Sequence, residues 1–399
     1  MTRHALLFGM GLAVSALGFG TPAQAAGTLV QGDGSFVGGP TEAVDIAHVR
    51  AVLFQQQDAV TAVIQAATRA DETIGSAWIL PIHGEILAPP AAADPAMIAE
   101  LLRVSDPMFE QTVAGIPGCT VGCSAMGDSG QDVLADLGVF EATKAGATWS
   151  HFGPSVVGAA MDSLVDSGFA LTDALQAGLE AHAASGGSVV VMFFTDERLD
   201  AATPALVVRY EASEMLMPQA LTALSADATV QTSVLTITAD GATGPVGVPH
   251  VMPELGIPLY EPTRTPEFYT ARARLALDEA GGSSWLLEYS NTLESLDERS
   301  DRLLELGVLW EAGGRPWSGL RALVDRGLLD SFRAEEVWIT RWRTYQKPEY
   351  LTDQVFAPDA SVPAYEVYLE ASQFSAAAWA WPMPLLLGAW AFGRRRRRV

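Results

Sequence analysis

The sequence is poor in basic residues, and above all in lysine. Its 399 residues include 24 Lys and Arg against 47 Asp and Glu, which gives a formal net charge of −23. This shortage of bases excludes a nucleic-acid binder that relies on basic patches, because the phosphate backbone would repel such a surface. Lys144 and Lys347 are the only lysines, and Asn291 is the only asparagine. Their joint depletion indicates GC-rich coding rather than salt adaptation or an acidic binding surface.

Cysteine is nearly absent too, since only Cys119 and Cys123 occur. Two cysteines exclude a small fold built on disulfides, while an apolar content of 49% is enough to build a real core. In an oxidising compartment the simplest outcome is a local disulfide between the two. Closing so short a loop contributes about 2 kcal/mol, too little to hold a domain together. A redox-active pair or half of a zinc site are the alternatives.

No pattern of catalytic, cofactor-binding or metal-ligating residues stands out. The segment Gly127-Asp-Ser129-Gly130, with His48 after an alanine, is similar to the surroundings of a serine-protease nucleophile and base. However, Gln131 replaces the next glycine and the chain is helix-rich, which favours a polar loop. The histidines lack metal-binding spacing, and we expect surface or structural roles for them. They are His4, His48, His83, His151, His182 and His250.

Residues 1–25 have the features of a secretory signal peptide. Arg3 supplies a positive start, an uncharged apolar run extends from Ala5 to Phe19, and Ala23-Gln-Ala25 is a typical cleavage site. The apolar run is shorter than the roughly 20 residues that span a bilayer, which favours removal over anchoring. We therefore predict export, with signal peptidase as a processing partner.

The C-terminal end has the features of a membrane anchor. An uncharged stretch of 17 residues runs from Ala376 to Phe392 and is followed by five arginines. Its length is at the lower limit for a spanning helix, and the basic block is expected to stay cytoplasmic, with the acidic body outside. A buried helix is the alternative, but the arginines would lack partners in a core. The predicted anchor residues are Trp379, Trp390, Arg394, Arg395, Arg396, Arg397 and Arg398.

The body between these ends is predicted to be a mixed α+β fold with a mainly antiparallel sheet and packed helices. The continuously apolar run over 188–195 is typical of a strand covered on both faces, whereas 336–345 alternates. Asp94 and Pro95 have the character of a helix cap and a first helical residue. Other strands are predicted over 48–54, 59–68, 76–82, 205–211, 230–238 and 284–289, and helices over 94–103, 155–166, 172–184, 266–280 and within 298–329.

The length of the body favours two lobes, because single cores usually stop growing below this size. The predicted organisation is a signal peptide (1–25), a flexible lead-in (26–42), a β-rich α+β lobe (43–245), a linker (246–265), a helix-rich α+β lobe (266–374) and a transmembrane or sorting tail (375–399). A set of tryptophans is expected in the core of the second lobe rather than on a carbohydrate platform. These are Trp310, Trp317, Trp338 and Trp342.

An ordered set of short motifs resembles a known family. The set consists of Ala77-Trp-Ile-Leu-Pro81, a glycine-cysteine loop at Cys119, VVVMFFT after a helix pair, Val208-Arg-Tyr210 with Leu216-Met-Pro218, and Thr340-Arg-Trp-Arg343 before Asp353-Gln-Val-Phe356. Over residues 44–358 it is similar to the exported bacterial proteins catalogued as domain of unknown function 2330. The tail also resembles the sorting tails of some bacterial surface proteins. The resemblance implies an exported or membrane-anchored protein and supplies no catalytic residues.

Two classes of function follow from the sequence. The first is a non-catalytic, membrane-anchored envelope protein whose rigid acidic ectodomain binds a ligand or has a structural role. The second is an extracytoplasmic hydrolase whose residues meet only in three dimensions. The lipid bilayer, signal peptidase and a C-terminal sorting enzyme are the expected partners; no nucleic acid or cofactor is expected, and the ligand stays open. A deep pocket with two carboxylates, or a histidine near Ser129, would favour the hydrolase.

Overall fold

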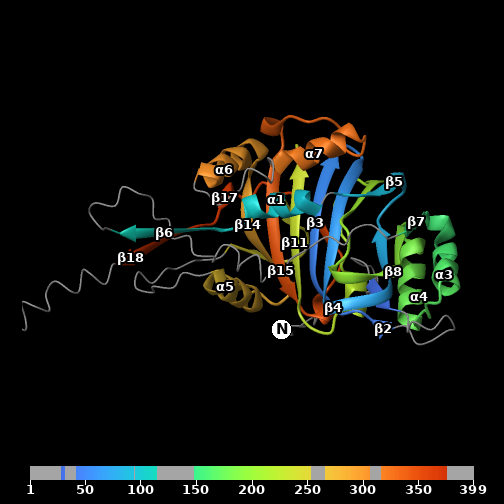
Figure 1. Ribbon diagram of the computed structural model, residues 1–399. Helices are drawn as coiled ribbons and strands as arrows, with labels where there is room; N and C mark the ends of the chain where they lie inside the picture. The colour runs from blue at the N-terminus through green and yellow to red at the C-terminus, as the bar shows by residue number, and fades with distance from the viewer. Residues whose placement is uncertain are drawn as a thin grey trace, which may run out of the picture.

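One large, mainly antiparallel sheet with helices on its faces forms the body of the protein, as the computed structural model shows (Figure 1). This confirms the predicted mixed α+β class. The structure describes residues 28–31, 42–93, 95–114, 148–252, 266–305 and 316–374. The predicted signal peptide, the disulfide pair Cys119 and Cys123, the helix cap Asp94 and the anchor residues Trp379, Trp390 and Arg394 to Arg398 lie outside these ranges.

The main path of the sheet runs through eight strands in the described part of the chain. In spatial order they are β13 (His250–Val251), β14 (Trp285–Thr292), β15 (Trp338–Gln346), β11 (Val230–Thr238), β3 (Ile46–Gln56), β4 (Ala59–Ile82), β1 (Thr28–Gln31) and β2 (Glu42–Ala43). Five further strands pair off this path: β5 (Ile86–Ala92), β7 (Thr148–Phe152), β8 (Ser188–Ala202), β9 (Leu206–Glu211) and β17 (Tyr365–Glu366).

Strand β4 joins two parts of the sheet. Its first half pairs with β3 and β9, and its second half pairs with β8 and β1. The sequence predicted two strands here, broken at 71–73, but β4 continues through this segment because Glu72 and Thr73 pair with β8. Residues 28–31, in the predicted lead-in, form β1 against residues 76–79.

The parallel pairing of β11 with β3 lies at the centre of the sheet. On its other edge, β11 pairs antiparallel with β15 over its whole length. Every residue of β11 is buried, since both of its faces are covered. Strands from both sides of the predicted linker (246–265) therefore belong to one sheet, while the division into lobes stays a prediction.

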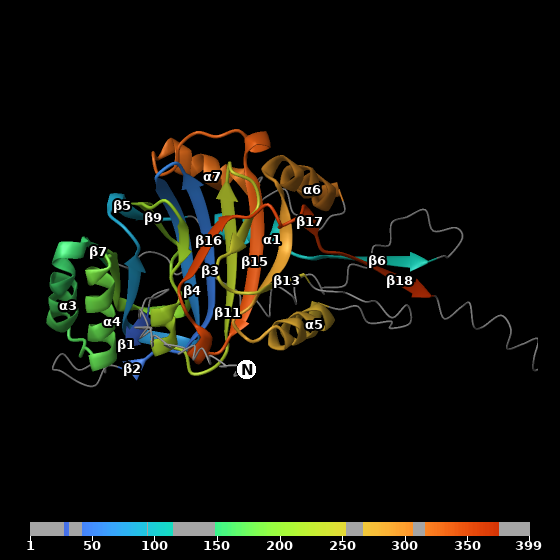
Figure 2. The same ribbon diagram turned by 180° about the vertical axis from the view of Figure 1, so that it is seen from behind.

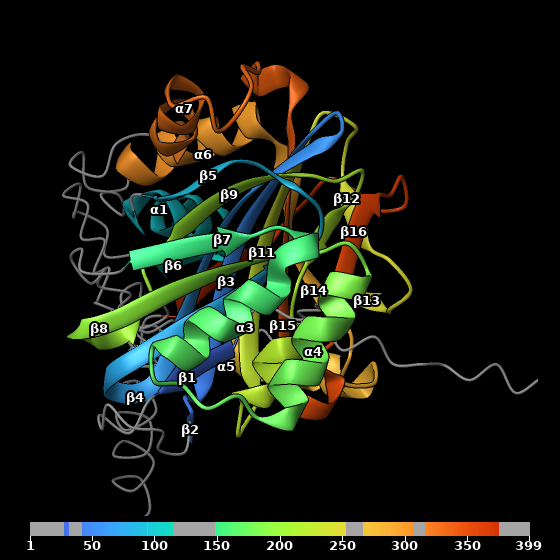
Figure 3. The same cartoon turned by 90° about the vertical axis from the view of Figure 1, so that its right-hand side faces the viewer.

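The helices form separate layers on the sheet (Figures 1 and 2). Helices α1 (Pro95–Ser105), α6 (Leu293–Glu305) and α7 (Pro316–Asp325) lie on one face. Their apolar side chains pack in one buried cluster with side chains of β3, β11 and β15. Helices α3 (Val157–Asp166) and α4 (Asp173–Ala184) cover β8 and the second half of β4, as Figure 3 shows. Helix α5 (Pro266–Glu279) packs on β14 and β15 through Tyr269, Ala273 and Leu277.

The opposite side of the central strands packs against a smaller sheet. This three-stranded sheet has the order β10 (Met215–Met217), β16 (Gln354–Pro358) and β12 (Thr243–Pro245). Trp78, Trp285, Trp342 and Phe356 are fully buried in one apolar cluster with Met215 and Met217 of this smaller sheet. Short 3₁₀ turns connect the elements: η1 (Pro154–Val156), η2 (Ala220–Leu224), η4 (Ala334–Glu336) and η5 (Pro348–Tyr350).

A two-stranded ribbon projects from the body. It consists of β6 (Met108–Ala114) and β18 (Tyr368–Phe374), which pair in parallel (Figure 1). Asp106 directly follows the last residue of α1, and strand β6 begins two residues later. The ribbon is therefore connected to the sheet face that carries α1 and α6.

Candidate functional site

A row of polar side chains crosses the centre of the sheet on the α1 face. Arg50 of β3 lies directly opposite Ser233 of β11, which in turn lies opposite Arg343 of β15. Arg341 lies two residues before Arg343 and therefore faces the same side. All four side chains are buried, with exposed fractions of 5% or less. Burying guanidinium groups costs free energy unless carboxylates and hydrogen bonds compensate them.

Glu288 of β14 compensates two of these arginines. Its Oε2 atom lies 2.8 Å from Arg341 Nε, and its Oε1 atom lies 3.1 Å from Arg343 Nε. The hydroxyl of Tyr269, on α5, donates a hydrogen bond to the same Oε1 at 2.9 Å. Glu288 is fully buried, so this carboxylate ties α5 to two strands.

Asp106, just after α1, brings the helical layer into the same network. It forms ion pairs with Arg341 and Arg343, and its main-chain oxygen accepts a hydrogen bond from Arg299 of α6. Arg299 also pairs with Glu366 at 2.9 Å and lies over the ring of Tyr289. The network of Arg50, Arg299, Arg341, Arg343, Glu288, Asp106 and Glu366, called the arginine network below, therefore connects sheet and helices.

The seven named members of this network are four guanidinium groups and three carboxylates. The pKa of Arg50 is lowered to about 9, chiefly by burial; Asp106 opposes this lowering, whereas Arg341 and Arg343 add to it. Burial also lowers the pKa of Arg343, but Glu288, Tyr345 and Asp106 outweigh burial and hold it well above its ordinary value. The surrounding charges thus stabilise Arg343 as a cation, whereas Arg50 is crowded by like charges.

A hollow of about 420 Å³ lies beside the arginine network. Its sheet wall is the adjacent row, in which His48 of β3 and Tyr345 of β15 flank Gln231 of β11. The other walls come from helix α5, from Arg69 in the middle of β4, from residues 228–229 just before β11 and from Lys347 just after β15. The lining residues are Ala47, His48, Arg69, Ala228, Thr229, Gln231, Arg274, Asp278, Tyr345 and Lys347. We call this site the basic hollow, because its cationic side chains outnumber its acidic ones in a chain of net charge −23.

The cations of the basic hollow are held in different ways. Arg69 is engaged by both carboxylate oxygens of Asp45 at 2.7 Å and by the main-chain oxygen of Thr229. Arg274 lies over the ring of Tyr345, 4.8 Å from its centroid. Lys347 is exposed, and within the described ranges neither it nor Arg274 forms an ion pair. Two accessible positive charges therefore face this hollow.

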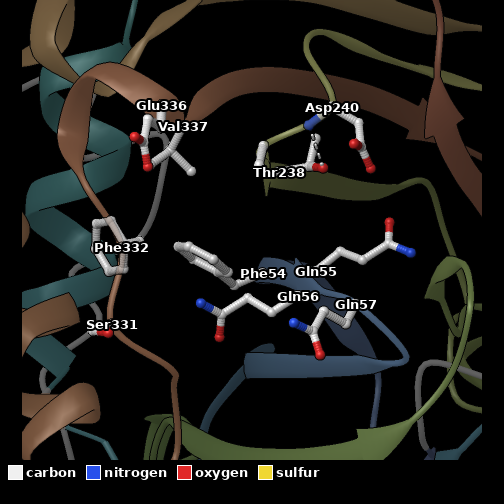
Figure 4. Close-up of a pocket in the computed structure, with 11 residues that line it drawn as sticks. Phe54, Gln55, Gln56, Gln57, Thr238, Asp240, Ser331, Phe332, Glu336 and Val337 are labelled. Carbon is white, nitrogen blue, oxygen red and sulfur yellow. Dashed lines mark hydrogen bonds between the residues drawn. The ribbon is translucent and has the colours of Figure 1, made fainter.

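A second hollow, of about 370 Å³, lies at the opposite end of the same strands (Figure 4). Three consecutive glutamines, Gln55 to Gln57, and the rings of Phe54 and Phe332 line it, together with the exposed carboxylates of Asp240 and Glu336. The Gln56 side chain is fixed by hydrogen bonds to both main-chain groups of Asp330. The two ends of the sheet thus differ in charge, one being basic and the other rich in amides and acids.

A histidine pair forms a third polar group, between β4 and α4. His83 Nε2 lies 3.0 Å from Asp353 Oδ2, and its ring meets the ring of His182 edge-on at 4.9 Å. The other carboxylate oxygen of Asp353 accepts hydrogen bonds from the main-chain amides of Gln219 and Ala220. Asp353 therefore connects His83 to the start of η2, which indicates a structural role for this group.

The structure locates several of the candidate residues that the sequence suggested. His48 lines the basic hollow, while Ser129 lies outside the described ranges. Trp342 is fully buried, and Trp338 donates a hydrogen bond to Ser290, but Trp310 lies outside the described part. Among the described residues, no group of three or more metal-binding side chains occurs, and no helix there has the length and apolarity to cross a membrane.

The comparisons with known proteins add little. No family model and no curated protein matches the chain. Among solved structures, the crystal structure of baculovirus P35 is similar at 9% identity with a TM-score of 0.28, over 48% of this chain. The match spans 64% of that chain, less than two thirds of its length. At this TM-score the likeness carries no argument about fold or function.

Proposed function

We propose that the protein is an exported, membrane-anchored component of the bacterial cell envelope whose body is a non-catalytic binding ectodomain. The observation that carries the binding role is the basic hollow, a cationic site on a strongly acidic body. Its sheet wall adjoins the arginine network, which connects strands and helices and keeps the wall rigid. A rigid wall favours binding, because little conformational entropy is lost when a ligand docks.

Export and anchoring rest on the two ends of the sequence. The signal peptide (1–25) directs the chain out of the cytoplasm, and the apolar stretch before Arg394 to Arg398 retains it in the membrane. In an oxidising compartment Cys119 and Cys123 form a local disulfide. This proposal also includes the lead-in (26–42), the division of the body into two lobes (43–245 and 266–374) and processing of the tail by a sorting enzyme.

Fractionation of cells tests the location. The full chain and a form ended after Phe374 are produced in the same bacterial host, and membrane and soluble extracytoplasmic fractions are compared. We expect the full chain in the membrane fraction and the shortened form mostly in the soluble one, because the apolar stretch supplies the membrane affinity. Equal release of both forms would contradict the anchor, and recovery of both from the cytosol with residues 1–25 intact would contradict export.

The hydrolase alternative has one observation in its favour. Asp240 and Glu336 line the second hollow, and paired carboxylates are the usual groups for hydrolysis of glycosidic bonds. Both side chains are exposed, however, and Glu336 lies 3.5 Å from Arg333. A general acid is normally buried, so that its pKa rises. Binding is therefore the better-supported function.

A further inference from the structure

The chemistry of the basic hollow indicates the class of its ligand. Arg274 holds its guanidinium over the Tyr345 ring, which restricts its orientation without using its N–H donors. Lys347 follows Tyr345 by two residues, about 7 Å along an extended chain. A planar guanidinium and an ammonium group therefore lie at one wall of the same hollow. This pair matches oxyanions, since Arg binds carboxylate or phosphate by two parallel hydrogen bonds and Lys adds a point charge.

The one acidic lining residue leaves this pair available. Asp278 lies one helical turn after Arg274 on α5, yet the two form no ion pair within the described ranges. Asp45, behind the wall, is already engaged by Arg69 and by the main-chain amide of Asp227.

We propose that the basic hollow binds an oxyanion, a carboxylate or phosphate group carried by a larger ligand, between Arg274 and Lys347. This inference rests on the proposed binding function and names its ligand class. A hollow of about 420 Å³ exceeds the size of a lone phosphate, so the anionic group forms only part of the bound molecule. The side chain of Gln231 lines the same hollow and is a polar group for its remainder.

Titration of the full chain, purified in non-ionic detergent, tests the proposal. Inorganic phosphate and citrate are added separately at constant ionic strength, and binding is followed by calorimetry. The site variant R274Q/K347Q removes two exposed positive charges from the hollow. The matched control R321Q/R333Q removes two exposed positive charges at the other end of the sheet. Circular dichroism of each variant confirms that it is folded.

We expect the site variant to bind the preferred anion about tenfold more weakly, because each lost charge-assisted hydrogen bond weakens binding severalfold or more. The control should stay within about twofold of the unmodified chain. D278N should bind about twofold more tightly, since it removes the acid beside Arg274. Preference for phosphate or for citrate identifies the source of the oxyanion.

Absence of binding by the unmodified chain, or equal loss in the site variant and the control, would overturn the proposal. Either result would leave export and anchoring untouched, because fractionation measures those independently of the hollow. Cytosolic recovery in the fractionation experiment would refute the envelope proposal, while the titration would still report on the hollow.

Discussion

At the scale of single residues, Glu288 is the centre of the arginine network. It contacts Arg341, Arg343 and Tyr269 and is fully buried. Burial together with Glu288 raises the pKa of Tyr269 well above its ordinary value, which keeps the phenol protonated as a donor. A buried carboxylate that compensates two guanidinium groups is costly to lose, because the cations would stay buried without it.

We therefore predict that E288Q lowers the free energy of unfolding by about 3–5 kcal/mol, since glutamine keeps the shape but leaves Asp106 as the one carboxylate that the described residues pair with both Arg341 and Arg343. Urea unfolding followed by tryptophan fluorescence measures the change. D330N is the control, because Asp330 pairs with Arg209 while 60% exposed and should cost less than about 1 kcal/mol. Equal effects of the two substitutions would refute the central role of Glu288.

His182 gives the protein a pH-dependent stability. Burial lowers its pKa below the ordinary value near 6.5, and neighbouring His83 lowers it further, which outweighs the bonds to Ser188 and Ile82. The unfolded chain therefore takes up a proton on this residue at a higher pH than the folded chain. The corresponding stability is present above about pH 6.5 and is lost as the pH falls towards the folded-state pKa.

The test compares the loss of unfolding free energy between about pH 7.5 and about pH 5. We expect a smaller loss in H182Q than in the unmodified protein, because glutamine cannot titrate. H151Q, at an exposed position on β7, serves as the control for the substitution itself. An unchanged slope in H182Q would contradict the role of this imidazole.

At the scale of elements, local sequence signals determine where several helices and strands lie. Thr172 caps α4, its hydroxyl oxygen accepting a hydrogen bond from the amide of Leu175 at 3.2 Å. The sequence pattern predicted a helix from this threonine to Ala184, and the structure confirms it. The strand predicted over 230–238 matches β11 at both ends.

Removal of the α4 cap should loosen the helix without unfolding the body. We expect T172A to cost about 1 kcal/mol, which corresponds to about fivefold faster hydrogen exchange of the first amides of α4. Hydrogen exchange with mass spectrometry measures this locally. T172S keeps the hydroxyl and should exchange like the unmodified protein; the same acceleration in both variants would show that the hydroxyl does not cap the helix.

Connections between elements were harder to predict than the elements themselves. The acidic segment over 71–73 has the composition of a turn, but pairing with β8 keeps it extended within β4. The short strand β16 had no clear pattern, because two neighbouring strands in a separate small sheet define it. In both cases partners distant in sequence outweigh the local preference.

At the scale of the whole molecule, the sheet creates two different ends. The parallel pairing of β3 with β11 places His48 and Gln231 at one end, and Phe54 and Ile237 near the other. The basic hollow forms at the first end and the amide-rich hollow at the second. The anion site that we propose, at α5 and the end of β15, therefore lies at the opposite end of the sheet from Asp240 and Glu336.

Only part of the candidate site was visible in the sequence. Arg341 and Arg343 stand at alternate positions of a predicted strand, which is a signal for two cations on one face. Their partners Glu288 and Asp106 come from other elements and gave no comparable signal. Arg274 and Lys347 are far apart in the chain and line the same hollow only because α5 packs on β15.

The sequence alone determined the α+β class and most of the strand and helix positions, because hydrophobic periodicity and capping act over a few residues. The charge balance and the signals at both ends are also properties of the sequence. Only the tertiary structure decided which charges are buried together and which face solvent. The arginine network and the basic hollow depend on strand register and helix packing, which bring together residues hundreds of positions apart.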